Sequence, residues 1–257
     1  MKSLELSRGY LTPHRRMIIG RSLAAAFAGA VPLPFVDDWL SSSIERKTIE
    51  KIADAHSIDI DPQALTAIAD GPEAPPKWAE LVGGGLALRI VSKQWKKLWV
   101  TVLAAKRAKA AGASFEVATL FDHYCARLHV GMGLDAVSGQ KLRTLIDKAR
   151  AETDGALSGH LFRKGLVAAA RSSVRAPTEI ADLLSGGRIR KLLSRSTEIE
   201  ATTEVDEALE MQLRSESSFL ARSAAAIELQ LAVERNTYLE SLVRNFDRIY
   251  REASEEE

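Results

Sequence analysis

The sequence predicts an all-α protein, a multi-helix bundle. Aromatic residues make up only 6% of the 257 residues while alanine is abundant, which favours closely packed helices over sheets built from branched and aromatic side chains. Apolar residues recur at helical spacing along most of the chain, and the strict two-residue alternation of half-buried strands is absent. With 46% apolar and 27% charged residues, the chain is able to bury one sizeable core or two modest ones.

Composition shifts divide the chain into four expected regions. Residues 1–13 are polar and weakly patterned, which predicts a flexible lead-in. Residues 14–72 are expected to form a helical hairpin. Residues 73–195 begin with a proline-rich linker and are expected to form a helical bundle, whereas residues 196–257 are expected to form one long acidic helix.

The hairpin is predicted from an alanine-rich run that meets two prolines and then two acids. Pro32 and Pro34 interrupt the helix because proline lacks the backbone donor and clashes with the preceding turn. Asp37 and Asp38 follow at the start of an amphipathic helix, where carboxylates suit the positive end of the helix dipole. We therefore interpret the two acids as structural parts of the hairpin turn.

The uncharged run over residues 22–36 leaves two alternatives open. A helix of this length covers about 22 Å, too short to cross a hydrocarbon core of about 30 Å. It forms either a buried helix or a shallow membrane contact that pivots on the two prolines and uses Phe27 and Phe35.

Residues 86–110 form a basic helix pattern with tryptophans. The surrounding residues 81–115 hold seven basic residues and no acid. Indole rings favour the headgroup boundary and lysines attract anionic lipid, so the pattern is typical of an interfacial membrane helix. The alternative is a core-facing helix whose lysines are solvated, and nucleic-acid binding is disfavoured because no known motif accompanies the charge. The residues predicted to contact a membrane are Phe27, Phe35, Arg89, Lys93, Trp95, Lys96, Lys97 and Trp99.

A new helix is expected to begin at Ser114 and to carry Asp122, Cys125 and His129 on one face. These residue types bind zinc, but a structural zinc site needs four ligands and no second pair is visible in the sequence. A thiol inside a helix is more often a small buried hydrophobe than a nucleophile. We therefore predict no catalytic residue, no metal ligand and no cofactor.

The C-terminal pattern predicts a long helix with an apolar stripe, which needs a partner to bury it. That partner is a second copy in a coiled coil, another protein, or the chain's own core. The residues predicted to bind it are Leu220, Ile227, Leu231, Leu242 and Phe246.

A resemblance adds to the hairpin prediction. The segment from Gly20 to His56 resembles the first two helices of the uncharacterised helical domain of YcjF-type membrane proteins, which is also appended to Era-like GTPases. The matching pattern is an alanine-rich helix, a Pro-x-Pro turn and an acid, here Pro32, Pro34 and Asp37. The resemblance extends over residues 15–150. It implies that the protein associates with membranes or with GTPase modules. The sequence lacks a phosphate-binding loop and the Asn-Lys-x-Asp motif, so a GTPase would be a separate partner.

These observations together predict a non-enzymatic, membrane-peripheral adaptor or scaffold. The single cysteine, Cys125, allows no intrachain disulfide and favours a reducing compartment, so we expect a cytoplasmic protein that contacts the inner face of the membrane. The alternative is a soluble regulator or subunit of a GTPase-containing or motility-type complex. An enzyme that uses the Asp122, Cys125 and His129 face is a third hypothesis.

Overall fold

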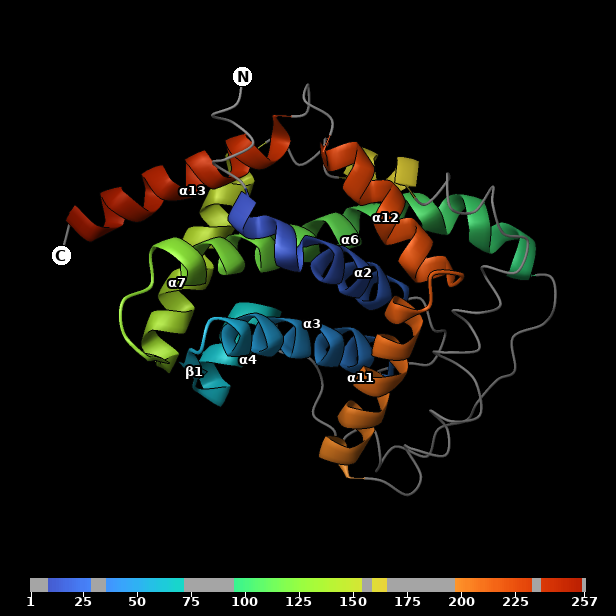
Figure 1. The fold of residues 1–257 in the computed structure, drawn as a ribbon, viewed down its shortest axis with the longest axis horizontal. Coiled ribbons are helices and arrows are strands. Elements are labelled where there is room, and N and C mark those ends of the chain that lie inside the picture. The colour runs from blue at the N-terminus through green and yellow to red at the C-terminus, as the bar shows by residue number, and fades with distance from the viewer. Residues whose placement is uncertain are drawn as a thin grey trace.

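The computed structural model describes residues 9–28, 36–71, 95–153, 159–165, 197–232 and 237–255, except the side chains of residues 36, 37 and 95–107. These residues form an all-α bundle, as the sequence predicts (Figure 1). In chain order the elements are η1 (Gly9–Leu11), α2 (Thr12–Ala28), α3 (Val36–Ala55), β1 (Asp59–Ile60), α4 (Pro62–Asp70), α6 (Trp95–Arg127), β2 (Gly133–Leu134), α7 (Ala136–Ala151), α11 (Glu198–Arg214), α12 (Phe219–Ala232) and α13 (Tyr238–Glu255).

Two helix–loop–helix units, α3–β1–α4 and α6–β2–α7, are joined through their loops. The two-residue strands β1 and β2 pair in parallel. Each is followed by an aspartate that caps the next helix: Asp61 accepts from the backbone N–H of Gln63 and Asp135 from that of Ser138, both at 2.7 Å. Because the strands run in the same direction, α4 packs beside α7 and α3 beside α6. The bundle is therefore organised around the two loops.

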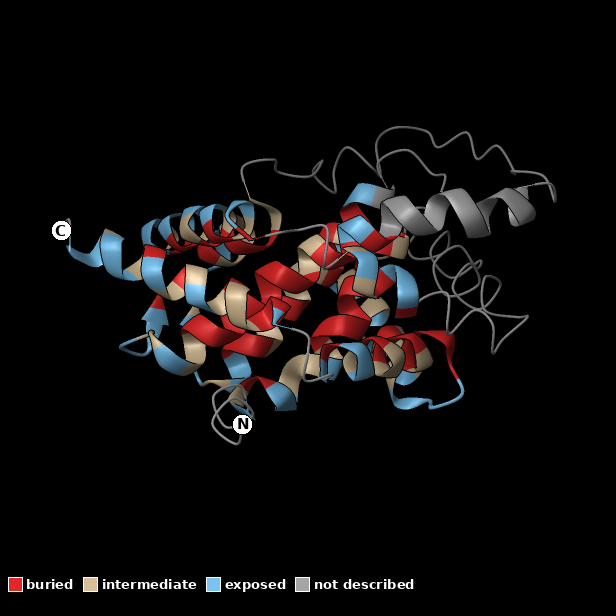
Figure 2. Cartoon of the chain, turned by 90° about the horizontal axis from the view of Figure 1, so that it is seen from above, coloured by how far each residue is buried: buried red, intermediate tan, exposed pale blue. Residues whose placement is uncertain are grey.

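The core surrounds α2, which packs against α3, α6 and α12. Its residues from Ile18 to Ala26 are all buried, and buried residues fill the middle of the bundle (Figure 2). For residues 22–28 the buried-helix alternative is thus confirmed. Small alanine side chains let neighbouring helices approach closely, which explains why a segment without a strong apolar stripe lies at the centre. Among the described residues, every helix is too short or too polar to span a bilayer.

The prediction of a flexible lead-in over residues 1–13 is wrong for residues 9–13. These residues form η1 and the start of α2, and Leu11 is buried. The positions four and three residues before Leu11 hold the polar residues Ser7 and Arg8, so periodicity did not identify Leu11 as a core residue. Its burial depends on the surface of α6 rather than on a local pattern.

The predicted helix start at Ser114 is also wrong, because α6 is one continuous helix of 33 residues, about 50 Å long. It runs the length of the body in Figure 1. Gly112 lies inside it and is buried. A single glycine in a helix interior costs about 1 kcal/mol relative to alanine, which packing on both sides easily offsets.

The single long C-terminal helix is replaced by three helices, α11, α12 and α13. The break after α11 contains neither proline nor glycine but the sequence Ser215 to Ser218. The Ser218 hydroxyl donates to the carbonyl of Gln212 at 2.6 Å and accepts from the backbone N–H of Ala221 at 3.0 Å, capping α12. Short hydroxyl side chains compete with helical backbone bonds in this way, so a serine-rich stretch ends a helix despite a continuous apolar period.

Candidate metal centre

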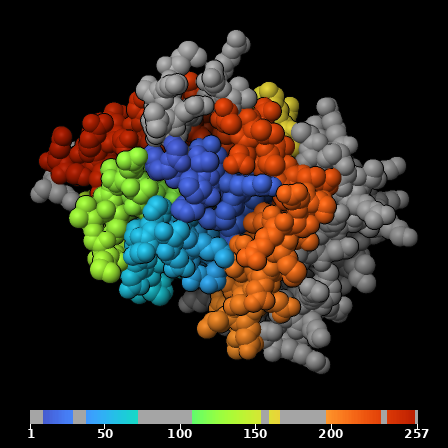
Figure 3. All heavy atoms as spheres, viewed as in Figure 1, coloured from blue at the N-terminus to red at the C-terminus, as the bar shows by residue number. Residues whose placement is uncertain are grey.

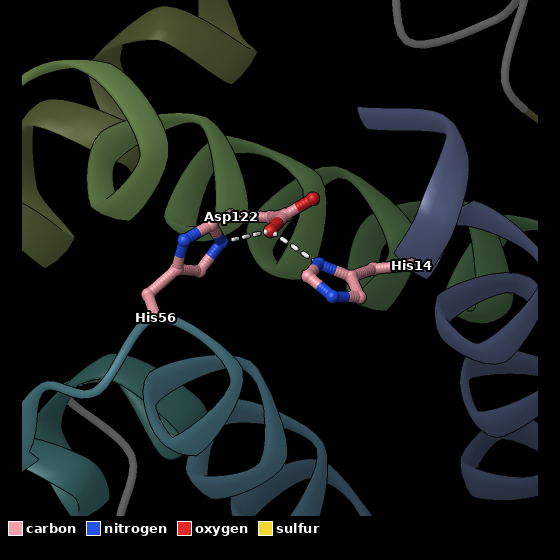
Figure 4. A group of neighbouring side chains, drawn as sticks. All are labelled: His14, His56 and Asp122. Carbon is pink, nitrogen blue, oxygen red and sulfur yellow. Dashed lines mark hydrogen bonds and ion pairs between the residues drawn. The ribbon is translucent and has the colours of Figure 1, made fainter. Parts of the chain in front are cut away.

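Three side chains from distant parts of the chain meet at one end of the bundle: His14, His56 and Asp122 (Figure 4). His14 lies in the first turn of α2, His56 in the turn that follows α3, and Asp122 near the end of α6. A nitrogen of each imidazole and an oxygen of the carboxylate all lie within 4.8 Å of one another.

The local sequence fixes each of the three positions. Pro13 sits in the first turn of α2, where its missing N–H costs no helical bond, and it starts the helix just before His14. The backbone N–H of His56 donates to the carbonyls of Ile52 and Ala53, and Ser57 takes a left-handed conformation with φ of 58° that reverses the chain. Asp122 is held by the long helix α6, whose neighbouring Phe121 is buried in the core.

The carboxylate is at the centre of the group. Oδ1 of Asp122 accepts from Nδ1 of His14 at 2.9 Å and from Nε2 of His56 at 2.8 Å. The Asp122 side chain is 1% exposed, whereas those of His14 and His56 are 24% and 20% exposed, so the group is reached from the imidazole side. The two rings meet edge to face with centroids 5.4 Å apart.

The second oxygen of Asp122 has no partner. Oδ2 is buried and makes no hydrogen bond with any donor among the described residues. A buried polar atom without a partner costs about 1–3 kcal/mol, more when it is charged. Such a cost persists when the atom serves a function, for instance as a ligand.

Two imidazoles and one carboxylate match the donors that first-row transition metals prefer. Tetrahedral ligands at metal distances of 2.0–2.2 Å lie about 3.4 Å apart. The two nitrogen–oxygen separations, 2.9 Å and 2.8 Å, are shorter than this value, and all three ligand atoms lie within 4.8 Å of one another. Three protein ligands leave at least one coordination position for water or another molecule. Calcium and magnesium are disfavoured because they prefer sites built from oxygen.

A second polar cluster lies beside the first. His123 accepts from the Tyr10 hydroxyl through Nδ1 at 2.5 Å and donates to Asp247 of α13 through Nε2 at 2.8 Å. The guanidinium carbon of Arg127 lies 4.4 Å from the centre of the Tyr10 ring. Burial, with help from the Asp247 charge, raises the pKa of Tyr10 to about 12, so the hydroxyl keeps its proton and donates it to His123.

The sequence-predicted face of α6 divides between different roles. Asp122 belongs to the candidate metal centre, but its partners there are His14 and His56, which were not predicted from the sequence as ligands. His129 instead contacts the Tyr124 hydroxyl at 3.1 Å. Burial and the nearby Asp122 charge raise the pKa of the Cys125 thiol, which keeps it protonated and unsuited to nucleophilic or metal chemistry.

The residues predicted to bind a partner of the C-terminal stripe are buried in the chain's own core, which is one of the three alternatives that the sequence left open. Their apolar stripe packs on α2 through α12 and on α6 and α7 through α13. The periodicity identified buried positions correctly but could not say what buries them. The five residues are Leu220, Ile227, Leu231, Leu242 and Phe246.

The predicted membrane-contact and turn residues fall mostly outside the described residues. Phe27 is described and packs edge to face against Phe219, with ring centroids 6.0 Å apart, as part of the core margin. Asp38 is exposed at the start of α3. Outside the described residues lie Pro32, Pro34, Phe35, Arg89 and Lys93, together with the side chains of Asp37, Trp95, Lys96, Lys97 and Trp99.

No family model, no curated protein and no solved structure matches this chain. The resemblance to the YcjF-type helical domain therefore stays a prediction.

Proposed function

We propose that this chain is a helical scaffold protein that binds a divalent transition-metal cation through His14, His56 and Asp122. The observation that carries the proposal is the buried Asp122 carboxylate, which has two imidazole nitrogens within 3 Å of one oxygen and no partner for the other. A bound cation would neutralise this carboxylate and replace two hydrogen bonds by coordination bonds.

The position of the group supports a structural role for the cation. Its ligands come from the start of α2, the turn after α3 and the end of α6, segments that are more than 40 residues apart in sequence. A cation that bridges such segments in the folded state but not in the unfolded chain stabilises the fold by mass action. The gain is about 2.7 kcal/mol when the free cation is at about 100 times its Kd.

Zinc titration of the metal-free protein tests this proposal. We expect about one equivalent of Zn²⁺ to bind, Co²⁺ to give the visible absorption of a low-symmetry nitrogen–oxygen site, and Mg²⁺ and Ca²⁺ to have no effect. Asp122→Asn should abolish binding. His14→Gln, at a partly exposed position, should weaken binding without threatening the fold, and His160→Gln at an exposed position away from the group is the matched control. Unchanged Zn²⁺ binding in both site variants would refute the proposal.

Membrane contact is a second candidate function, favoured by the continuity of α6. The basic segment with two tryptophans at the start of α6 belongs to the same continuous helix as Asp122, which is buried near its end. The lysines and tryptophans in the sequence of this end of α6 suit contact with an anionic surface.

Sedimentation with anionic and with zwitterionic vesicles tests the membrane candidate. We expect the protein to sediment with the anionic vesicles and Trp95→Asp to abolish this. Failure to sediment with either vesicle would favour the alternative of a soluble regulator within a GTPase-containing or motility-type complex.

A further inference from the structure

We infer that cation binding at His14, His56 and Asp122 locks the N-terminal segment, residues 9–14, onto α6, so that the cation decides whether this segment is docked or free. This inference rests on the proposed cation site. The segment comprises η1 and the start of α2. It lies within the part of the chain coloured dark blue in Figure 3, which is visible at the surface in this view.

Three side chains of the segment hold it on the body. Leu11 is buried. Tyr10 donates to His123 and stacks under Arg127, and His14 donates to Asp122. These polar contacts of Tyr10 and His14 are thus all made to the last two turns of α6.

The proposed cation site is divided unequally between the body and the segment. His56 and Asp122 belong to α3's end and to α6, which pack together within the core, and they contact each other at 2.8 Å without help from the segment. His14 is contributed by the segment itself. The body therefore supplies a two-ligand half-site, and undocking of the segment removes the third ligand from any bound cation.

Because the ligands are divided in this way, cation binding and docking of the segment are thermodynamically coupled. A cation held by three ligands binds the docked form more tightly than the undocked form with two, and its differential affinity shifts the docking equilibrium by the same factor. Where the undocked form does not retain the cation, the undocked population falls about 100-fold at a free cation concentration of about 100 times Kd.

The second cluster confines the effect to the N-terminal segment. His123 uses opposite ring nitrogens for Tyr10 and for Asp247, so the bond to Asp247 on α13 remains when Tyr10 leaves. His123 also packs edge to face with Phe246 of α13, with ring centroids 6.0 Å apart. Release of the segment should therefore leave α13 in place.

Limited digestion of the full-length protein with chymotrypsin tests the inference. Cleavage after Tyr10 or Leu11 requires undocking, and cleavage after Phe246 in the same digest reports opening of α13. When cleavage is slower than reclosing, its rate follows the open population. We expect Zn²⁺ to slow cleavage after Tyr10 by 10-fold to about 100-fold and cleavage after Phe246 by less than about 2-fold.

Variants separate the inference from the proposed function. In His14→Gln, Zn²⁺ should no longer slow cleavage after Leu11, which also controls for any effect of Zn²⁺ on the protease. Tyr10→Phe loosens the segment without touching a ligand, so cleavage after Leu11 should become faster without cation and remain strongly protected by it.

Three results would overturn the inference. Stoichiometric Zn²⁺ binding in the titration with no protection at residues 10 and 11 would leave the cation site standing and refute the locking of the segment. Equal protection at residues 11 and 246 would show a general gain in stability in place of local docking. Absence of Zn²⁺ binding would refute the proposed function itself, and the inference with it.

Discussion

Neutralising the acids around Arg21 should destabilise the protein more than replacing Arg21 itself. Arg21 lies in the middle of α2 with a side chain that is 0% exposed, yet it is a permanent cation. It donates to the Thr48 hydroxyl at 3.0 Å, to Glu210 at 2.9 Å and to Asp206. Lys51 contacts both acids from the outer side, at 3.2 Å and 3.5 Å.

The expected order of stability among the variants depends on which charged side chain loses its counter-charge. The acids have side chains that are 17% and 28% exposed, so after Arg21→Met they keep Lys51 and some water, and we expect a loss of about 1–3 kcal/mol. Asp206→Asn with Glu210→Gln leaves a wholly buried guanidinium without a counter-charge, which costs about 3–5 kcal/mol. Adding Arg21→Met to that pair should restore part of the stability, since it removes the unpaired charge.

Urea unfolding of the four proteins, followed by circular dichroism at constant ionic strength, measures these differences as shifts in the midpoint with an unchanged slope. Ser42→Ala, at a buried position on α3, removes the hydrogen bond from the Ser42 hydroxyl to the Asp70 carboxylate and shows the cost of losing one charge-assisted bond outside the Arg21 network. If Arg21→Met is the most destabilising variant, or if the triple variant is the least stable, the ion pairs do not determine the stability of this interface and the reasoning fails.

Two further predictions concern helix packing and pH. Gly139→Ala should destabilise the protein by about 1–3 kcal/mol because the new Cβ would lie 2.8 Å from the Cα of Ala64 on α4, whereas Gly9→Ala meets no atom within 4 Å and should be neutral; thermal unfolding of both variants decides this. Burial raises the pKa of Glu45 from 4.5 to about 7, although hydrogen bonding to Ser114 opposes this. The folded protein then holds a proton that the unfolded chain releases between these pH values, so stability should fall by about 1–2 kcal/mol as pH rises from 4.5 to 7, a value reduced for partial exposure. Urea midpoints of Glu45→Gln measured across that range should lack this fall, and an identical fall would contradict the assignment.

The helix content of the fold could be predicted from the sequence, but the way in which the helices pack could not. Composition and period identified the helices now seen as α2 and α3, and the helical character of the C-terminal region, because these features depend on local propensity. The division of the C-terminal region was missed because it depends on hydrogen bonds of the Ser218 hydroxyl, which leave the apolar period unbroken. The same period is produced by a stripe that faces a partner and by one that faces the chain's own core, so the sequence left open what buries Leu220 and Phe246.

The proposed metal centre shows a different limit of sequence-based reasoning. Asp122 was considered as a zinc ligand only together with Cys125 and His129, and metal binding was predicted to be absent, because spacing within one helix is the geometry that a sequence specifies directly and this helix face offers no second pair of ligands. His14 and His56 are 108 and 66 residues away from it, so their meeting depends on the packing of three helices. One sign was available, since a carboxylate among the buried positions of α6 needs compensation and the helix itself supplies none. The compensating groups of a buried charge are therefore best sought among polar residues next to helix ends elsewhere in the chain, where His14 and His56 both lie.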